Sequence, residues 1–478
     1  MSIGKHIEEH IALGGIPKKS QALGYARPAG KIVLLGSSIV SIGDADASSP
    51  YFTGTSHLIS GNSPFHRANF RLGCPFTSIT NAGSSGGKAA DIYTAFKNTA
   101  LPANPDWIYL ETMRNDCAID LANGYTIAQI RTAVNDVWTA SVAPLLSTAR
   151  NMGIGIIFQT IPPGDALDAG RQEEFAKGCA MVNRRIMEYC YDNKGAILFD
   201  LAPVWRLYTS AANIAQNKGD TQYFSVAATV HQNPLGGQVA GDVLYDTLKD
   251  YFQKGHQRVT ASWDGTDGDV DNALTNSILF GTAGTTTKPL RVTGNIATSW
   301  DVNPYYIDFT TTTVVCAKVT HWNTLYPAVP AQSIRVTVQP AHVAEDLYFA
   351  ANEFVAFASA INAISGSQFA VGDTVFGEIA VDVTENSGTA ATTMLIIEMT
   401  GSGAENVVAI ANAPTEGTGT TVRLNGGKIT DGVLRTKPFV IPTGTTHLTL
   451  KVVMLTSAGG DVTWKFATPQ LCKSQTYT

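Results

Sequence analysis

The chain has 478 residues, of which 44% are hydrophobic and only 15% are charged. This composition describes a globular chain, and the length exceeds what one hydrophobic core usually organises. The net charge of −6 provides no basic surface for a phosphate backbone, so nucleic acid is not expected as a partner. No apolar run reaches the roughly 18 residues that cross a bilayer, and no secretory signal opens the chain, so no membrane partner is expected.

The six cysteines form no CxxC pair, which argues against a zinc knuckle or a thioredoxin-like motif. The histidines outside the candidate site described below show no metal-ligand spacing either. We therefore expect no metal and no cofactor, and a fold that does not depend on disulfides.

Residues 1–27 are typical of an N-terminal arm, and from residue 28 strand and helix patterns alternate. The predicted strands, rich in β-branched and aromatic residues, are 31–36, 77–82, 106–112, 154–160 and 196–201. The predicted helices lie at about 89–98, 126–150, 170–192 and 235–254. This alternation predicts an α/β domain, a flavodoxin-like three-layer sandwich with a five-stranded parallel sheet.

Chemistry-bearing residues follow the predicted strands at their carboxyl ends, the edge where open α/β folds place their sites. Ser38 ends the run KIVLLGSS, Gly86 lies in the glycine-rich turn NAGSSGG, and Asn115 follows the third strand in MRND. His231 stands in VHQNP at the entrance of the last helix. A serine, a histidine and hydrogen-bond donors for an oxyanion at one rim indicate nucleophilic catalysis by the serine.

The order GSS, NAGSSG, RND and HQNP resembles the SGNH (GDSL-type) hydrolase family over about residues 30–255. The resemblance implies that Ser38 is the nucleophile and also an oxyanion donor through its N–H. It implies that Gly86 and Asn115 complete the oxyanion hole, and that His231 is the general base. The activity that it implies is hydrolysis of carboxylic esters.

Three positions depart from the family pattern. Ser37 replaces the usual aspartate before the nucleophile, and Met113 stands where a glycine is common. Ala228 occupies the place of the acid that normally lies three residues before the histidine, where a carboxylate orients the imidazole. The orienting group is therefore unknown, and the main-chain carbonyl of Ala228 and the carboxylate of Asp220 are both candidates.

A rival nucleophile lies in the same domain. Gly83, Ser85 and Gly87 fit GxSxG, the nucleophile elbow of α/β-hydrolases, between a predicted strand and a predicted helix. Only one strand precedes this turn, whereas the elbow usually follows several, so Ser38 is the preferred nucleophile.

The composition changes near residue 257. We assign 28–256 to an SGNH-type esterase domain, 257–272 to a linker and 273–478 to a β-sandwich, because short alternating runs separated by turn residues fill the last segment. Its closing strands loosely resemble jelly-roll carbohydrate-binding modules. The aromatic residues available to stack on a sugar ring are Trp300, Tyr305, Tyr306, Trp322, Tyr326 and Trp464.

These features predict a serine carboxylesterase, specifically an O-acetylesterase that acts on an acetylated polysaccharide and therefore has an acylated carbohydrate as its partner. Without a signal, an extracellular or virion location suits a phage tail component released by lysis, and a cytoplasmic location also stays open. Such a component would form a homo-oligomer, a trimer in a virion fibre. The alternatives are a catalytically weak or inactive glycan- or receptor-binding virion protein, and an esterase or lipase for small acyl esters.

Overall fold

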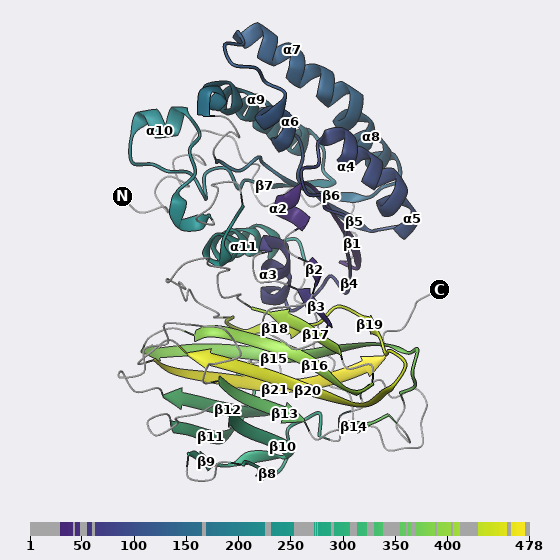
Figure 1. Ribbon diagram of the computed structural model, residues 1–478, viewed down its shortest axis with the longest axis vertical. Helices are drawn as coiled ribbons and strands as arrows, with labels where there is room; N and C mark the ends of the chain where they lie inside the picture. The colour runs from purple at the N-terminus through teal and green to yellow at the C-terminus, as the bar shows by residue number, and fades with distance from the viewer. Residues whose placement is uncertain are drawn as a thin grey trace.

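The computed structural model describes residues 29–41, 44–47, 55–59, 63–164, 169–224 and 231–252, and discontinuous segments from 272 to 473. An α/β domain is stacked on a β-sandwich (Figure 1). Ala228, residues 1–28, and the stretch 253–271 that holds most of the predicted linker lie outside the described residues.

The α/β domain is built on five parallel strands in the order β4-β1-β5-β6-β7. Their bounds are Lys31–Leu35 (β1), Ser78–Asn81 (β4), Trp107–Leu110 (β5), Gly155–Gln159 (β6) and Ala196–Phe199 (β7). In chain order these strands are arranged 2-1-3-4-5, which is the flavodoxin-like order. The predicted fold class and the five predicted strands are therefore confirmed.

Helices cover both faces of this sheet. The longer ones are Pro64–Arg71 (α3), Ala89–Ala95 (α4), Ile127–Val137 (α7), Ala143–Asn151 (α8), Gln172–Asp192 (α9) and Pro234–Leu248 (α11). The shorter ones are Ser38–Ser41 (α2), Leu101–Ala103 (α5), Arg114–Ile119 (α6) and Ala211–Ala215 (α10). π-Helical turns lie at Phe96–Ala100 and Trp138–Val142, and 3₁₀ turns at Ala169–Arg171 and Thr221–Tyr223.

Alternate residues of each strand face the two helical layers, because successive side chains of a strand point to opposite faces. On β1, Val33 and Leu35 join a core with α4 and α7 to α9, whereas Ile32 and Leu34 join a second core with α3 and α11. The first strand is consequently buried on both sides, which is typical of a central parallel strand.

The second domain is a β-sandwich of two mixed sheets, ordered β2-β3-β17-β16-β20-β13-β10-β8 and β18-β15-β21-β12-β11-β9. The strands are Asp44–Ala47 (β2), Thr55–Ile59 (β3), Ala283–Thr285 (β8), Val292–Gly294 (β9), Ile296–Tyr305 (β10), Thr313–Thr320 (β11), Pro330–Thr337 (β12), Phe354–Ser359 (β13), Asn362–Ala363 (β14), Thr374–Ser387 (β15), Ala390–Gly401 (β16), Glu405–Ile410 (β17), Gly432–Arg435 (β18), Phe439–Val440 (β19), Thr445–Thr456 (β20) and Asp461–Lys473 (β21).

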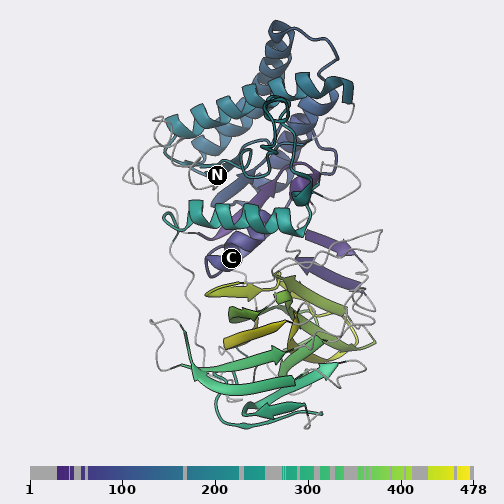
Figure 2. The ribbon, with the colours of Figure 1, turned by 90° about the vertical axis from the view of Figure 1, so that its left-hand side faces the viewer.

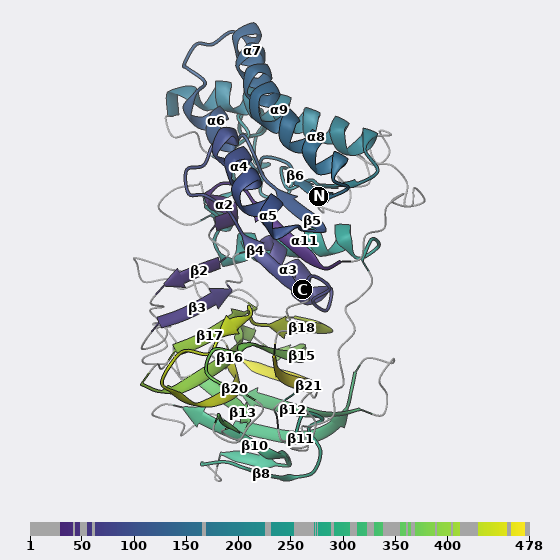
Figure 3. The ribbon, with the colours of Figure 1, turned by 90° about the vertical axis from the view of Figure 1, so that its right-hand side faces the viewer.

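The two domains share a sheet, which the predicted boundaries do not anticipate. Strands β2 and β3 form a hairpin between the nucleophile segment and α3, and β3 pairs in parallel with β17 of the sandwich. Figure 3 shows this hairpin beside β17, on the sandwich side of the junction. Residues 44–47 and 55–59, assigned to the esterase domain, therefore extend the sandwich. Strand β3 pairs with a strand more than 340 positions away in the sequence, and β2 pairs with β3.

Helix α3 lies between α11 and the sandwich, and both Figure 1 and Figure 2 show this arrangement. A Cβ added at Gly241 of α11 would stand 2.8 Å from Cβ of Arg67 on α3, and one added at Gly432 of β18 would stand 3.1 Å from the carbonyl oxygen of Phe70. Glycine at both positions lets the three elements approach closely.

Candidate active site

Ser38 stands where β1 ends and α2 begins. The turn is tight: a Cβ at Gly36 would lie 2.4 Å from Cγ2 of Val40 and 2.9 Å from Oε2 of Glu111. Only glycine fits there, so the chain turns sharply and brings the hydroxyl of Ser38 to the carboxyl edge of the sheet. The side chain is largely buried.

The structure brings His231 to Ser38, although 193 positions separate them in the sequence, and Nε2 of the imidazole lies 2.9 Å from Oγ of the serine. The next residue, Gln232, donates from Nε2 to the carbonyl oxygen of Ile39 at 3.0 Å. The following Asn233 caps α11, its Oδ1 accepting from the N–H of Gly236 at 2.9 Å. The imidazole is thus held by the first turn of α11 and by the residue after the nucleophile.

Burial lowers the pKa of His231, and the nearby Arg114 guanidinium lowers it further. Both effects favour the neutral imidazole, which is the form that accepts a proton. Among the described residues no carboxylate is hydrogen-bonded to Nδ1 of His231. The carboxylate of Asp220 instead accepts from the N–H and from Nε2 of Gln222, and Ala228 lies outside the described residues.

The predicted oxyanion donors come from the three adjacent strands β4, β1 and β5. Gly86 has φ +72°, and a Cβ there would meet no atom within 4 Å, so the turn after β4 is open on this side. Nδ2 of Asn115 donates to the carbonyl oxygen of Gly87 at 3.0 Å. Because an amide nitrogen carries two hydrogens, one remains for a substrate oxygen.

The turn that presents Asn115 explains one departure from the family pattern. Met113, at the N-cap of α6, has φ 65°, in the left-handed region that favours glycine. Its side chain is buried in the core beneath α4 and α9. Apolar burial therefore compensates at this position for the strain that glycine would avoid.

Sequence reasoning missed Glu111, which follows β5 and is completely buried. Its Oε2 accepts from the N–H of Ser37 at 2.6 Å, and its carboxylate also accepts from the hydroxyl of Ser37. Burial raises the pKa of Glu111, and the bonds from Ser37 oppose that rise. The signal in the sequence was an acidic residue at the end of an otherwise apolar strand.

The rival Ser85 is exposed in the turn between β4 and α4. The N–H of Gly87 closes this turn on the carbonyl oxygen of Ser84 at 2.9 Å, and α4 begins only at Ala89. The chain does not pass directly from strand to helix here, as a nucleophile elbow requires. Among the described residues, no histidine is hydrogen-bonded to Ser85.

Among the aromatic residues considered for sugar stacking, those that the structure describes are buried or half-buried. Trp300 and Trp464 are buried, and their indole N–H groups donate to Asn276 and Thr393. Trp322 is half-buried, stacks on His321, and donates to Asp431. The side chains of Tyr305, Tyr306 and Tyr326 lie outside the described residues.

Within the described segments, no group of three or more His, Cys, Asp or Glu is arranged to hold a metal ion. None of the described helices combines the length and the apolar character needed to cross a membrane.

No protein-family model and no curated protein sequence matches the chain. Among solved structures, a GDSL-like lipase from Bacteroides thetaiotaomicron is 15% identical with a TM-score of 0.32, and the alignment covers 52% of this chain and 94% of that one. An acetyl xylan esterase is 18% identical (TM-score 0.31; 45% and 98% covered). The enzymatically active domain of tailspike protein 4 of bacteriophage CBA120 is 11% identical (TM-score 0.24; 43% and 22% covered). The strand order, with three motifs directly after β1, β4 and β5 and the fourth before α11, gives this domain an SGNH-like fold.

Proposed function

We propose that the protein is a serine carboxylesterase that removes acetyl or other small acyl groups from an acylated polysaccharide. The observation that carries the proposal is the 2.9 Å separation between Nε2 of His231 and Oγ of Ser38. A hydroxyl within hydrogen-bond reach of a neutral imidazole is the arrangement that activates a serine nucleophile.

In acylation, Oγ of Ser38 attacks the ester carbonyl while Nε2 of His231 takes its proton. The carbonyl oxygen becomes an oxyanion, and the N–H groups of Ser38 and Gly86 and the amide of Asn115 donate to it. The C–O bond to the alcohol then breaks, and His231 returns the proton to the leaving alkoxide. A water molecule, deprotonated by the same imidazole, releases the acyl group from Ser38 by the reverse steps.

The two parts of the proposed substrate have different support. The small acyl group suits the restricted space around a largely buried nucleophile. The polysaccharide is inferred from the β-sandwich, whose architecture is shared by many carbohydrate-binding domains. A virion tail component, trimeric in a fibre, would place such an esterase on a glycan surface.

Hydrolysis of 4-nitrophenyl acetate and release of acetate from acetylated xylan test the proposal. We expect wild type to be active, Ser38→Ala and His231→Ala to fall to background, and Ser85→Ala to retain activity. Activity that survives in Ser38→Ala but is lost in Ser85→Ala would transfer the role of nucleophile to Ser85.

A second function, an inactive glycan- or receptor-binding protein, is favoured by one observation: no carboxylate of the described residues is hydrogen-bonded to Nδ1 of His231. An imidazole without an orienting carboxylate would be a weak general base, and catalysis would be correspondingly slow. If wild type and Ser38→Ala are equally inert on both esters while the protein still binds acetylated xylan in a pull-down, this second function replaces the first.

A further inference from the structure

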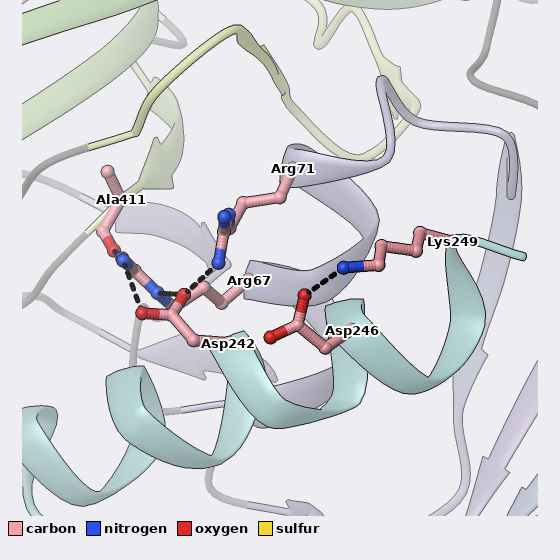
Figure 4. A network of polar contacts seen from close by, with 6 residues as sticks. All are labelled: Arg67, Arg71, Asp242, Asp246, Lys249 and Ala411. Atoms are coloured by element: carbon pink, nitrogen blue, oxygen red, sulfur yellow. Dashed lines mark hydrogen bonds and ion pairs between the residues drawn. The ribbon is translucent and has the colours of Figure 1, made fainter. Parts of the chain in front are cut away.

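A network of charged side chains connects the helix that follows His231 to the β-sandwich (Figure 4). Arg67 of α3 is buried, and its Nε donates to Oδ1 of Asp242 on α11 at 2.9 Å. Its Nη1 donates to the carbonyl oxygen of Ala411, directly after β17, at 3.4 Å. One guanidinium therefore joins α11 to the sandwich.

Arg71, one turn further along α3, contacts the same carboxylate: its Nη1 lies 2.9 Å from Oδ1 of Asp242. Its guanidinium also lies over the ring of Tyr245 on α11, 4.0 Å from the centroid. Both of these contacts of Arg71 join α3 to α11, and neither reaches the sandwich. Of the two arginines, Arg67 is the one with hydrogen bonds both to α11 and to the sandwich.

The position of α11 determines the position of the imidazole, because only Gln232 and Asn233 separate His231 from the first residue of the helix. The bond from Gln232 to Ile39 ties this segment to the nucleophile turn, and Asn233 also bonds the backbone of residues 222–224. The chain beyond α2 forms the hairpin that extends the sandwich sheet. The sandwich therefore pairs directly with the segment that follows Ser38, and it is connected through Arg67 to the helix that follows His231.

We propose that Arg67 is a positioning residue: by joining Asp242 to Ala411 it sets α11, and with it the imidazole of His231, at the correct distance from Ser38. This inference rests on the proposed esterase function. It assigns the sandwich a part in assembling the active site, in addition to any binding of glycan. A displacement of about 1 Å in such a pair costs up to about a hundredfold in rate.

The same helix supplies a matched control. Asp246 lies one turn beyond Asp242, and its carboxylate pairs with Lys249 at 2.6 Å, where both side chains are exposed. Asp246→Asn removes a carboxylate from α11 as Asp242→Asn does, but it breaks only a contact within the helix. A difference between the two variants therefore reports on the connection to α3 and the sandwich.

The experiment measures kcat and KM for 4-nitrophenyl acetate in full-length Arg67→Met, Arg67→Lys, Asp242→Asn and Asp246→Asn, well below their melting temperatures. We expect Arg67→Met to lower kcat about ten- to a hundredfold with KM unchanged. We expect Arg67→Lys to keep a higher kcat than Arg67→Met but a lower one than wild type. Its ammonium can still donate to one acceptor, whereas the guanidinium reaches two. Asp246→Asn should keep the wild-type kcat.

A wild-type kcat in Arg67→Met, whatever its melting temperature, would reduce Arg67 to a stabilising role and overturn the proposal. If Arg67→Met does not fold, Asp242→Asn decides in the same way, because the Asp242 side chain is 35% exposed and tolerates the change better. If Asp242→Asn then has the same kcat as Asp246→Asn, the proposal is overturned.

Hydrogen–deuterium exchange separates this inference from the proposed function, since it needs no activity. Should wild type hydrolyse no ester and Ser38 resist a fluorophosphonate, the esterase function fails. Faster exchange over residues 231–248 in Arg67→Met than in Asp246→Asn would still support the connection, and equal exchange would overturn it.

Discussion

The carboxylate of Glu111 accepts a hydrogen bond from the backbone N–H of Ser37, 2.6 Å away, directly before the nucleophile. This contact explains why the chain departs from the usual aspartate at position 37. An aspartate there would place a second carboxylate against a completely buried one, and like charges at such a distance disfavour each other. The small hydroxyl of Ser37 donates to Glu111 instead.

Glu111→Ala should destabilise the protein more than Glu111→Gln. The alanine variant leaves the buried N–H of Ser37 without an acceptor, which costs about 1–3 kcal/mol before any cavity is counted. Glutamine keeps an oxygen that accepts from this N–H and removes a buried charge. The free energy of unfolding of Glu111→Gln should therefore fall by no more than about 1 kcal/mol. Urea unfolding of the two variants measures the difference, and equal losses would contradict the role given to this bond.

At position 113 the glycine variant should be more stable than the alanine variant, which reverses the usual order of these two residues in a helix. Both substitutions delete the same buried side chain, but only glycine relieves the left-handed backbone at φ 65°. Met113→Gly should therefore be more stable than Met113→Ala by about 1 kcal/mol. Ala118→Gly, in the same α6, is the control and should lose about 1 kcal/mol. Chemical denaturation gives these values, and a less stable Met113→Gly would contradict the assignment of strain.

The sequence was sufficient to predict the parallel sheet and the rim on which Ser38, Gly86, Asn115 and His231 lie. Long apolar runs such as KIVLLG identify buried strands, and the carboxyl ends of parallel strands share one edge by geometry. The convergence of the three segments that follow strands thus follows from strand order, and the position of His231 before α11 adds the fourth.

The junction of the two domains was not predictable in this way. The hairpin strands β2 and β3 are only four and five residues long, and their stabilising partner β17 is remote in the sequence. The bond from Arg67 to the carbonyl oxygen of Ala411, separated by 344 positions, leaves no local pattern either. Contacts of this kind depend on how the two folded domains pack together, and the hydrophobic periodicity of a single segment carries no information about that packing.

The acid limb of kcat/KM should lie below pH 6.5, the ordinary pKa of histidine, because burial and Arg114 lower the pKa of His231. Protonation removes the base, so activity is lost as pH falls through this lowered pKa. Arg114→Gln should move the limb to higher pH by removing a nearby positive charge.

The control for this profile is Lys88→Ala, which removes an exposed cation that pairs with Asp120. Lys88 is not among the groups that shift the pKa of His231, so its variant should keep the wild-type limb. A limb at or above pH 6.5 in wild type, or one that Arg114→Gln leaves in place, would show that another group controls the profile.

Asn115→Ala should lower kcat by about 10²–10³ with little change in KM, because the amide donates to an oxygen that carries full charge only in the transition state. Asn183 provides a matched control: it is an asparagine of equal burial, 8% exposed, on α9, where it bonds the backbone of Ile161. Asn183→Ala should lose stability but keep kcat. Steady-state kinetics on 4-nitrophenyl acetate, paired with melting curves, distinguish the two. If both variants lose kcat in proportion to their lost stability, then Asn115 supports the turn that holds Gly87 and does not contact the oxyanion.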